Sequence, residues 1–411
     1  MPDRNRLPLL YAATFANFCA FGMYFTAIQL YVEEGLGGTK AQVGLAIGAF
    51  SLSAVVLRPV IGRGVDRRGR RPYLLGALAL LTLSSLGFFL AESLAAVVAL
   101  RLVQGVTGAC FYTTGAAMVT DMTPATRRAS GIAAFSLFLY GGFATGPAIA
   151  GALIDAGGFG WAWGTAAGLG AAGLTFAWFL PETGTEAITR RAALGPARRR
   201  PLHPAAVAPG IVLMTTGMGY ASVTGFSELY ARHIGMGSAG ALYATFAVTV
   251  IGVRLVSGRL ADTYGHTTVA LPGLGLCTVG LSLLSLVQNP TAAFPGVAAF
   301  GAGFALIFPA LMAFTVDRVE DHERGETLGS FTAFMDIGIG GGGYLVGFIA
   351  DRAGFTAAYG APAVLCALGA LLLVVLARRN GHGHGDGPGG GERAGSTGDQ
   401  PLGAVGRVAS Q

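Results

Sequence analysis

The chain has 411 residues, of which 53% are hydrophobic and only 12% are charged. Soluble globular domains usually carry about 25% charged residues, so this composition argues against a soluble protein. The formal net charge of +6 is small and dispersed over short loops, which argues against nucleic acid as a partner.

The apolar residues form long runs that follow one another along the chain. Each run has roughly 20 to 26 residues, enough to cross a hydrocarbon core of about 30 Å, and charges or Gly and Pro clusters mark its ends. The first run is too long for a signal-peptide core of roughly 7 to 15 residues, so we expect it to be retained as a helix. The sequence predicts an all-α membrane protein whose twelve transmembrane helices lie near residues 7–32, 41–63, 72–92, 95–119, 129–154, 160–180, 205–231, 239–261, 267–288, 293–316, 326–351 and 356–377.

The longest polar segment inside the chain contains Pro196, Pro201 and Pro204, which is typical of a linker. After residue 379 the chain is rich in Gly, Pro and Ser, so we expect a disordered cytoplasmic tail. The expected domains are an N-terminal six-helix bundle (1–181), a cytoplasmic linker (182–204), a C-terminal six-helix bundle (205–378) and the tail (379–411).

The arginines predict the orientation of the chain in the membrane. Twelve crossings put the arginine clusters at 63–71, 127–128, 190–200 and 378–379 on one side, whereas the opposite loops hold few arginines. Because cytoplasmic loops carry an excess of basic residues, we expect this side and both termini to be cytoplasmic. Nearly all basic residues are arginine, and Ala and Gly are abundant, which suggests a GC-rich bacterial genome and a multi-pass protein of the bacterial cytoplasmic (inner) membrane.

The four cysteines and the histidines of the tail do not form a metal-binding pattern. Cys19, Cys110, Cys277 and Cys366 all fall inside apolar runs and lack metal-ligand spacing, so we expect them to pack as small hydrophobic residues. Weak metal binding by His382 and His384 is an alternative to a solvated tail, and the solvated tail is favoured. We expect no metal site.

An internal repeat relates the two halves of the chain. Residues 58–69 match residues 254–265 at an offset of 254 − 58 = 196 positions. The same offset pairs Tyr24 with Tyr220, Gly105 with Gly301, Asp121 with Asp317, Arg128 with Arg324, Gly146 with Gly342, Gly151 with Gly347 and Asp155 with Asp351. Glycine richness alone explains some of the Gly pairs but not the Arg and Asp pairs, so the pattern indicates a duplicated six-helix unit.

The repeat and the loop after the second helix resemble the major facilitator superfamily. Its signature Gly-x-Leu-x-Asp-Arg-x-Gly-Arg-Arg stands here at residues 62–71 and departs from the family pattern only at Gly64. The resemblance implies two parallel six-helix bundles that move a small-molecule substrate by alternating access. It also implies protons and membrane lipids as partners, a proton gradient in place of a cofactor, and a monomer.

Two further motifs resemble the branch of bacterial drug:proton antiporters, or arabinose-efflux-type transporters. Residues 101–105 look like the family's Arg-x-x-Gln-Gly motif. The fifth helix carries Gly142, Gly146, Pro147 and Gly151 in a pattern associated with proton-coupled exporters. A Gly-rich helix that packs closely on its neighbour would carry similar residues without any bias toward export.

In the fold that this resemblance implies, the first, fourth, seventh and tenth helices line a central cavity. Polar and aromatic residues at mid-depth on these helices are candidates for substrate contact, namely Asn17, Tyr24, Gln29, Phe111, Tyr112, Tyr220, Phe226 and Phe308. Ordinary helix packing is an equally good interpretation for each residue alone. As a group they suggest a bulky, partly apolar substrate.

Two ionisable residues lie inside predicted spans. A charged side chain at a helix centre costs at least about 2.5 to 3.5 kcal/mol, so it requires a partner or a role. Asp336 lies near the midplane, and we expect its carboxylate to carry protons, with a hydrogen-bonded structural carboxylate as the alternative. Arg101 matches an arginine that is tied to proton transfer in related antiporters. Glu228 and Arg232, near the outer end of the seventh helix, are interpreted as an i, i+4 pair.

The cytoplasmic charges suggest a conformational latch. We expect Asp66 to form a charge network with Arg58, Asp121 and Arg128 at one level and to hold the halves together when the cavity opens outward. A role in topology and helix capping alone is the alternative, and it does not explain the second copy of the motif. The proposed latch residues are Arg58, Gly62, Asp66, Gly69, Arg70, Asp121, Arg128, Arg254 and Asp262.

The leading hypothesis is proton-coupled export of a small organic molecule, such as a drug, antibiotic or metabolite. Proton-coupled or facilitated uptake of a sugar, organic acid or other small solute is the alternative. The sequence has neither a catalytic cluster at a membrane face nor a Gly-x-x-x-x-Gly-Lys-Ser/Thr phosphate loop, so we expect neither an enzyme nor an ATP-driven pump.

Overall fold

The computed structural model describes residues 6–124, 127–183, 202–319 and 323–381. Most of the predicted linker and most of the predicted tail lie outside these residues. At a few helical positions, including Asp66 and Asp262, only the backbone is described.

The described residues form helices without any β-strand. The first half contains α1 (Leu7–Leu30), α2 (Lys40–Arg68), α3 (Arg71–Gly87), α4 (Leu94–Met122), α5 (Arg128–Gly157) and α6 (Phe159–Trp178), with a π-helical turn η2 (Tyr31–Gly35) after α1 and a 3-10 turn η3 (Phe88–Leu90) after α3. The second half contains α8 (Pro204–His233), α9 (Gly240–Tyr264), α10 (His266–Leu286), α11 (Pro290–Val316) and α12 (Arg324–Gly381).

Each predicted range overlaps one helix or one part of α12. That helix is interrupted at Gly354, whose φ of 71° and ψ of −175° are non-helical, so it contains the predicted helices 326–351 and 356–377. Within the described residues, nine helical segments are long and apolar enough to cross a membrane, and the longest is Thr327–Arg378. The chain is therefore an all-helical, multi-pass membrane protein.

Local sequence signals explain where several helices begin and end. Thr39 and Gln42 form a capping box that starts α2, and the Ser93 and Asn289 side chains accept hydrogen bonds from the first turns of α4 and α11. Helix α2 ends at Gly69, whose φ of 97° favours glycine. The short connections keep successive helices antiparallel, as a bundle of membrane spans requires.

Each half has its own aromatic core. In the first half, the Tyr24 hydroxyl donates to Ser85 Oγ at 2.7 Å, and the Tyr24 and Phe88 rings pack on Trp163 of α6. In the second half, the Tyr230 hydroxyl donates to the Leu284 carbonyl at 2.8 Å, and its ring packs against Tyr359. These large buried rings join the helices within a half, so each half forms a packed unit.

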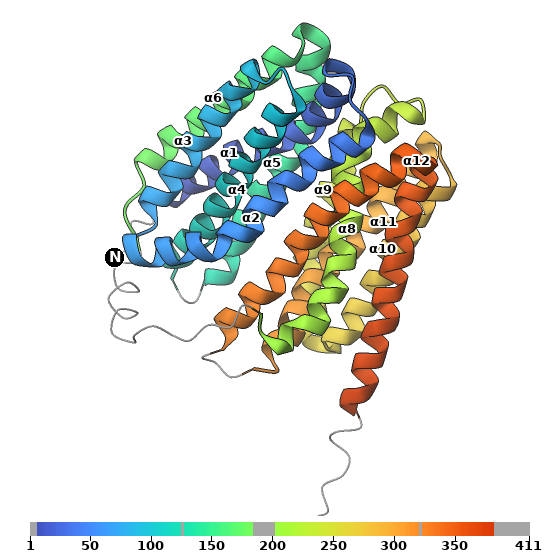
Figure 1. Cartoon of the computed structure of the whole chain (residues 1–411). Coiled ribbons are helices and arrows are strands. Elements are labelled where there is room, and N and C mark those ends of the chain that lie inside the picture. Colours follow the sequence, from blue (N-terminus) through green and yellow to red (C-terminus); the bar gives the residue numbers. More distant parts are fainter. Residues whose placement is uncertain (1–5, 125–126, 184–201, 320–322, 382–411) are drawn as a thin grey trace, which may run out of the picture.

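Figure 1 shows the two halves side by side, the first in blue to green and the second in yellow-green to red. We call the end at which α1 begins the terminal end and the opposite end, where α1 continues into η2, the far end. The halves lie close together toward the far end and spread apart toward the terminal end. Their close contact is made by glycines of α2 and α12, because a Cβ atom on Gly44 or Gly48 would overlap the backbone at Gly343 or Gly340.

Candidate functional site

An ion pair joins the two halves between α2 and α12. The guanidinium of Arg58 lies 2.8 Å from the Asp336 carboxylate, and the two side chains are 26% and 15% exposed. Asp336 lies 336 − 324 = 12 residues into α12, about 18 Å from its start at 1.5 Å per residue. The carboxylate predicted to carry protons is thus held deep in a membrane span by a cation of the other half.

The repeat relates this ion pair to a second contact between the halves. Arg254 corresponds to Arg58 (254 − 58 = 196), and Asp336 corresponds to Tyr140 (336 − 140 = 196). The Arg254 guanidinium lies 4.9 Å from the centre of the Tyr140 ring, which joins α9 to α5. The Arg58–Asp336 and Arg254–Tyr140 contacts therefore join equivalent pairs of positions, and only the first of these two contacts contains a carboxylate.

Two of the predicted substrate residues, Tyr112 and Tyr220, lie near these contacts. Tyr112 is 42% exposed, and its hydroxyl interacts electrostatically with Arg58, Asp336, Tyr140 and Arg254 from four other helices. Its exposed surface therefore faces the region between the halves.

Tyr220 and Phe308 are half-buried residues of the second half. The Tyr220 ring stacks on Phe304 at 5.0 Å, and Tyr220 interacts electrostatically with Tyr140 and Arg254. The Phe308 ring packs on Phe331 at 5.9 Å. Tyr112 and Tyr220 therefore supply aromatic surface and hydroxyl groups near the contacts that join the halves.

The other predicted substrate residues are buried elsewhere. Tyr24 and Phe111 belong to the core of the first half, where Phe111 packs on Phe18 at 5.8 Å. Asn17 and Phe226 are also fully buried, and the Asn17 amide has no hydrogen-bond partner among the described residues. In this conformation Tyr24 and Phe111 therefore pack within the first half.

Arg101 is buried inside the first half. Its Nε donates to the Ala46 carbonyl at 3.2 Å, one terminal nitrogen donates to Gln104 at 2.9 Å, and the guanidinium lies 4.8 Å from the Phe50 ring centre. Ala46 and Arg58 are 58 − 46 = 12 residues apart on α2, or about 18 Å. The structure therefore does not bring Arg101 to Asp336, and its role in proton coupling stays a prediction.

Five side chains close the far end of the interface, and we call them the far-end clasp: Thr26, Gln29, Glu34, Glu228 and Arg232. The Gln29 amide oxygen accepts from the backbone nitrogens of Glu228 and Leu229 at 3.1 and 3.3 Å, and its nitrogen donates to the Tyr243 hydroxyl at 3.0 Å. Arg232 forms ion pairs with Glu34 and Glu228. Gln29 was predicted to contact substrate, but its amide is fully engaged in joining α1 to α8 and α9.

A further carboxylate supports the far end and was not singled out as functional from the sequence. Asp351 of α12 accepts hydrogen bonds from the Lys40 and Ala41 nitrogens at 2.8 and 2.9 Å, which caps the start of α2 from the other half. The sequence contained one signal for Asp351, its repeat relation to Asp155. The i, i+4 pair predicted between Glu228 and Arg232 is present, but the contacts of Glu228 with the first half were not predicted.

The predicted latch residues separate into two groups. Asp121 pairs with Arg70 of the same half at 3.3 Å. Arg58 lies 68 − 58 = 10 residues before the end of α2, about 15 Å deeper in the membrane, and pairs with Asp336 instead. Arg58 and Asp121 are therefore not at one level, contrary to the prediction. Arg128 is exposed at the start of α5, and the side chains of Asp66 and Asp262 lie outside the described residues.

Around this latch region, Gly69 and Arg70 form the turn between α2 and α3. The Glu182 carboxylate accepts from the Arg70 and Arg71 nitrogens and so caps α3. A Cβ atom on Gly69 would overlap that carboxylate, whereas one on Gly62 would meet open space. The positive φ of Gly69 and the nearby carboxylate explain why glycine is required at this turn.

The glycines of the exporter-type motif let α5 approach α1. A Cβ atom on Gly142 or Gly146 would lie 2.6 Å from the Cys19 or Met23 nitrogen, respectively. Pro147 packs against Gly22 of α1, and Gly151 faces Ser238 of the other half. Close helix packing therefore accounts for Gly142, Gly146 and Pro147, so these residues carry little weight as evidence for export.

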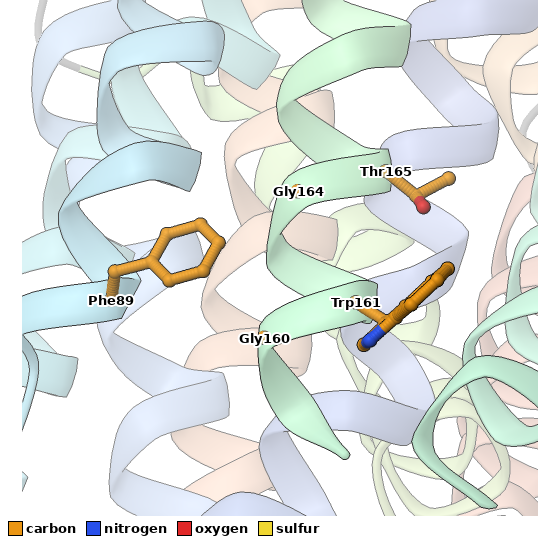
Figure 2. Close-up of a pocket in the computed structure, with 5 residues that line it drawn as sticks. All are labelled: Phe89, Gly160, Trp161, Gly164 and Thr165. Carbon is orange, nitrogen blue, oxygen red and sulfur yellow. The ribbon is translucent and has the colours of Figure 1, made fainter. Parts of the chain in front are cut away.

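A separate pocket of about 450 Å³ lies on the outer side of the first half, at η3 and α6. Figure 2 shows Phe89 facing Gly160 and Gly164 of α6, with Trp161 and Thr165 on the adjoining surface of that helix. Its lining residues all come from one half, so the pocket is separate from the contacts that join the halves.

The sequence matches one protein family over most of its length. The family model described as Major Facilitator Superfamily matches residues 10–340 and 296–404. An uncharacterized MFS-type transporter of Pseudomonas aeruginosa (strain LESB58) is 30% identical over 378 residues, which cover 89% of this chain and 91% of the relative. Another, from Burkholderia mallei (strain SAVP1), is 30% identical over 389 residues, which cover 89% of this chain and 90% of the relative.

Two solved transporters share the fold. The nucleoside transporter NupG superposes with a TM-score of 0.72 at 14% identity, covering 91% of this chain and 99% of its own. The human organic anion transporter MFSD10 (TETRAN) superposes with a TM-score of 0.66 at 18% identity, covering 91% of this chain and 100% of its own. At these identities the likeness concerns the fold alone.

Proposed function

Because the chain belongs to the major facilitator superfamily, and is therefore a transporter and not an enzyme, we propose that it exports a small organic molecule in exchange for protons. The proposed substrate is a drug, an antibiotic or a metabolite, and the driving force is the proton gradient without a cofactor. The protein would act as a monomer of twelve spans in the bacterial cytoplasmic membrane, with both termini in the cytoplasm. The arginine clusters support this orientation, in which the terminal end is cytoplasmic.

The observation that carries the proposal is the Arg58–Asp336 ion pair. Its two members belong to different halves, and the carboxylate lies deep in a membrane span. A proton on Asp336 removes the negative charge that holds Arg58, so protonation changes the interaction between α2 and α12. Because the halves must move against each other in alternating access, proton binding at this position acts directly on the conformational equilibrium.

Exchange requires that proton and substrate compete for the same group. A substrate whose N–H or O–H donors hydrogen-bond to the ionised Asp336 carboxylate favours its deprotonated form, so substrate binding expels the proton. Tyr112, Tyr220 and Phe308 would bind the apolar part of the same molecule. A nucleoside transporter and an organic anion transporter share this fold, which supports a polar organic molecule as the substrate.

The test is counter-transport in proteoliposomes with an imposed pH gradient, in which candidate compounds are scanned for movement coupled to proton flux. Asp336→Asn should abolish proton-driven transport while exchange of labelled for unlabelled substrate continues. Asp155→Asn is the matched control, because Asp155 is exposed at the end of α5 and should leave coupling intact.

Two outcomes would count against the proposal. Proton-driven transport that survives in Asp336→Asn would remove this carboxylate from the coupling mechanism. Movement of substrate and protons in the same direction would replace export with proton-coupled uptake, and movement without any proton dependence would indicate facilitated transport.

A further inference from the structure

Glu228 is a buried carboxylate at the point where the two halves meet at the far end. Its side chain is 1% exposed. One carboxylate oxygen accepts from the Ala239 nitrogen at 3.0 Å and from the Thr26 hydroxyl at 3.4 Å, and the other lies 3.5 Å from Arg232 Nε. The carboxylate therefore contacts α1 of the first half and the start of α9 in the second.

The groups that donate to the Glu228 carboxylate or pair with it, namely Thr26, the Ala239 N–H and Arg232, favour its ionised form. From α1, Thr26 donates to the carboxylate, and Gln29 accepts from the Glu228 backbone nitrogen. From α9, the Ala239 N–H donates to it, and the Tyr243 hydroxyl interacts with it electrostatically. On α8 itself, Arg232 pairs with Glu228 and also with Glu34 of η2, which links this cation to the first half.

The fold of a half does not require a carboxylate at this position. The repeat relates Glu228 to Val32 (228 − 32 = 196), which is fully buried in the first half. In the first half, an apolar side chain is therefore sufficient for packing at the equivalent position. Burying a carboxylate instead costs free energy unless its hydrogen bonds and ion pair are all formed, so the contacts at Glu228 depend on its charge.

We propose that Glu228 is a second proton-binding site, and that a proton bound there opens the far-end clasp. Protonation of one carboxylate oxygen removes the charge that attracts Arg232 and replaces charge-assisted hydrogen bonds from Thr26 and Ala239 with weaker neutral ones. The hydrogen bond from Thr26 joins the two halves, so its weakening acts directly on their contact. The closed far end is then destabilised relative to the open one.

This inference rests on the proposed function only for the side of the membrane from which protons reach Glu228. If the terminal end is cytoplasmic, the far end faces outward, and protons driven inward reach Glu228 before Asp336. External protons would then open the path to the Arg58–Asp336 site and would also bind at that site. The exporter would therefore be gated by the same ion that drives it.

The experiment measures the separation of the halves at the far end. Ala95 and Thr291 are exposed residues at the starts of α4 and α11, and the repeat relates them (291 − 95 = 196). Spin labels on Ala95→Cys and Thr291→Cys, read by double electron–electron resonance in lipid nanodiscs, report the separated and joined populations. The native cysteines are buried, and the protein without introduced cysteines checks that they remain unlabelled.

At pH 8 we expect Glu228→Gln to raise the separated population severalfold over that of the wild type. Glu33→Gln is the matched control, because it makes the same chemical change at a partly exposed ion pair within the first half, outside the clasp, and should have little effect. In Asp336→Asn, the halves should still separate at the far end when the pH is lowered from 8 to 5. In Asp336→Asn/Glu228→Gln, this response to pH should be lost.

An unchanged distance distribution in Glu228→Gln at pH 8, or a pH response that persists in the double variant, would overturn the inference. Because Glu228→Gln is isosteric and the wild-type titration needs no substitution in the clasp, a folding defect cannot mimic both results. Loss of proton coupling is measured separately by transport in Asp336→Asn. The gate and the proposed function can therefore fail independently.

Discussion

The Arg58–Asp336 pair can be removed one side chain at a time or together. Comparing the wild type with the two single variants and the double variant separates the energy of the pair from the energies of the single substitutions. In Arg58→Gln, the Asp336 carboxylate loses its cation inside a membrane span. Breaking a fully buried pair in this way costs about 3–5 kcal/mol, whereas an exposed pair contributes about 0–1 kcal/mol. Because these side chains are 26% and 15% exposed, we expect a coupling energy of about 1–3 kcal/mol.

The four native cysteines provide the assay for this cycle, because all are buried and react with a thiol-specific dye only when the protein unfolds. Arg58→Gln/Asp336→Asn should unfold at a higher temperature than Arg58→Gln, although it carries one more substitution. The control cycle uses Glu33→Gln and Lys40→Gln, whose pair is longer, at 3.8 Å, and more exposed, at 33% and 29%, so it should show less coupling. If the changes in unfolding temperature caused by the Arg58 and Asp336 substitutions add as closely as those of the control pair, the ion pair does not stabilise this conformation.

The remaining predictions concern close packing and the repeat. Gly146→Ala should cost about 1–3 kcal/mol of stability because its Cβ would lie 2.6 Å from the Met23 nitrogen, whereas Gly168→Ala, where the Cβ meets open space, should leave the unfolding temperature unchanged or higher. Gly44→Ala should increase the separated population that the far-end spin labels report, because its Cβ would overlap the Gly343 backbone; an unchanged population would mean that α2 and α12 adjust locally. Tyr140→Asp places a carboxylate opposite Arg254, as Asp336 lies opposite Arg58. The substitution should therefore lower the unfolding temperature less in the wild-type background than in the Arg254→Gln background. Equal decreases would mean that the two contacts between the halves are not equivalent.

The sequence predicted the helices well because membrane spans are marked by strong, local signals. Apolar runs interrupted by charges and glycines specify where each helix begins and ends, and the break at Gly354 coincides with the predicted interval between residues 351 and 356. The repeat predicted two similar halves. The helices extend past the predicted ranges where amphipathic ends such as 64–68 of α2 continue the backbone hydrogen bonding beyond the apolar run.

The side-chain environment was harder to predict. Helix α1 is apolar on nearly every face, so its sequence does not say which face packs within the first half and which faces the second. Tyr24 and Gln29 consequently share the predicted role of substrate contacts, although Tyr24 lies in a core and Gln29 lies in the far-end clasp.

Asp336 was identified as an ionisable residue of interest because a carboxylate inside a membrane span is costly wherever it lies. Its partner Arg58 was assigned to the terminal end instead, because contacts between the halves depend on how two separately folded units meet. A single sequence carries no periodic signal for such contacts. The distance along α2 between Arg58 and its end at Arg68 was the available clue to its depth.

Residues at equivalent positions of the repeat show which side chains both halves share and which occur in one half only. Arginine occupies positions 58 and 254 in both copies, but Asp336 corresponds to Tyr140 and Glu228 corresponds to Val32. Since each half folds around either side chain, the two carboxylates are not required for packing within a half, and their burial costs free energy. Both contact the opposite half, so a proton gained or lost at either one alters the interface between the halves and leaves the two cores unchanged. In a proton-coupled transporter, carboxylates placed in this way let the ion change the relative stability of the two orientations of the halves.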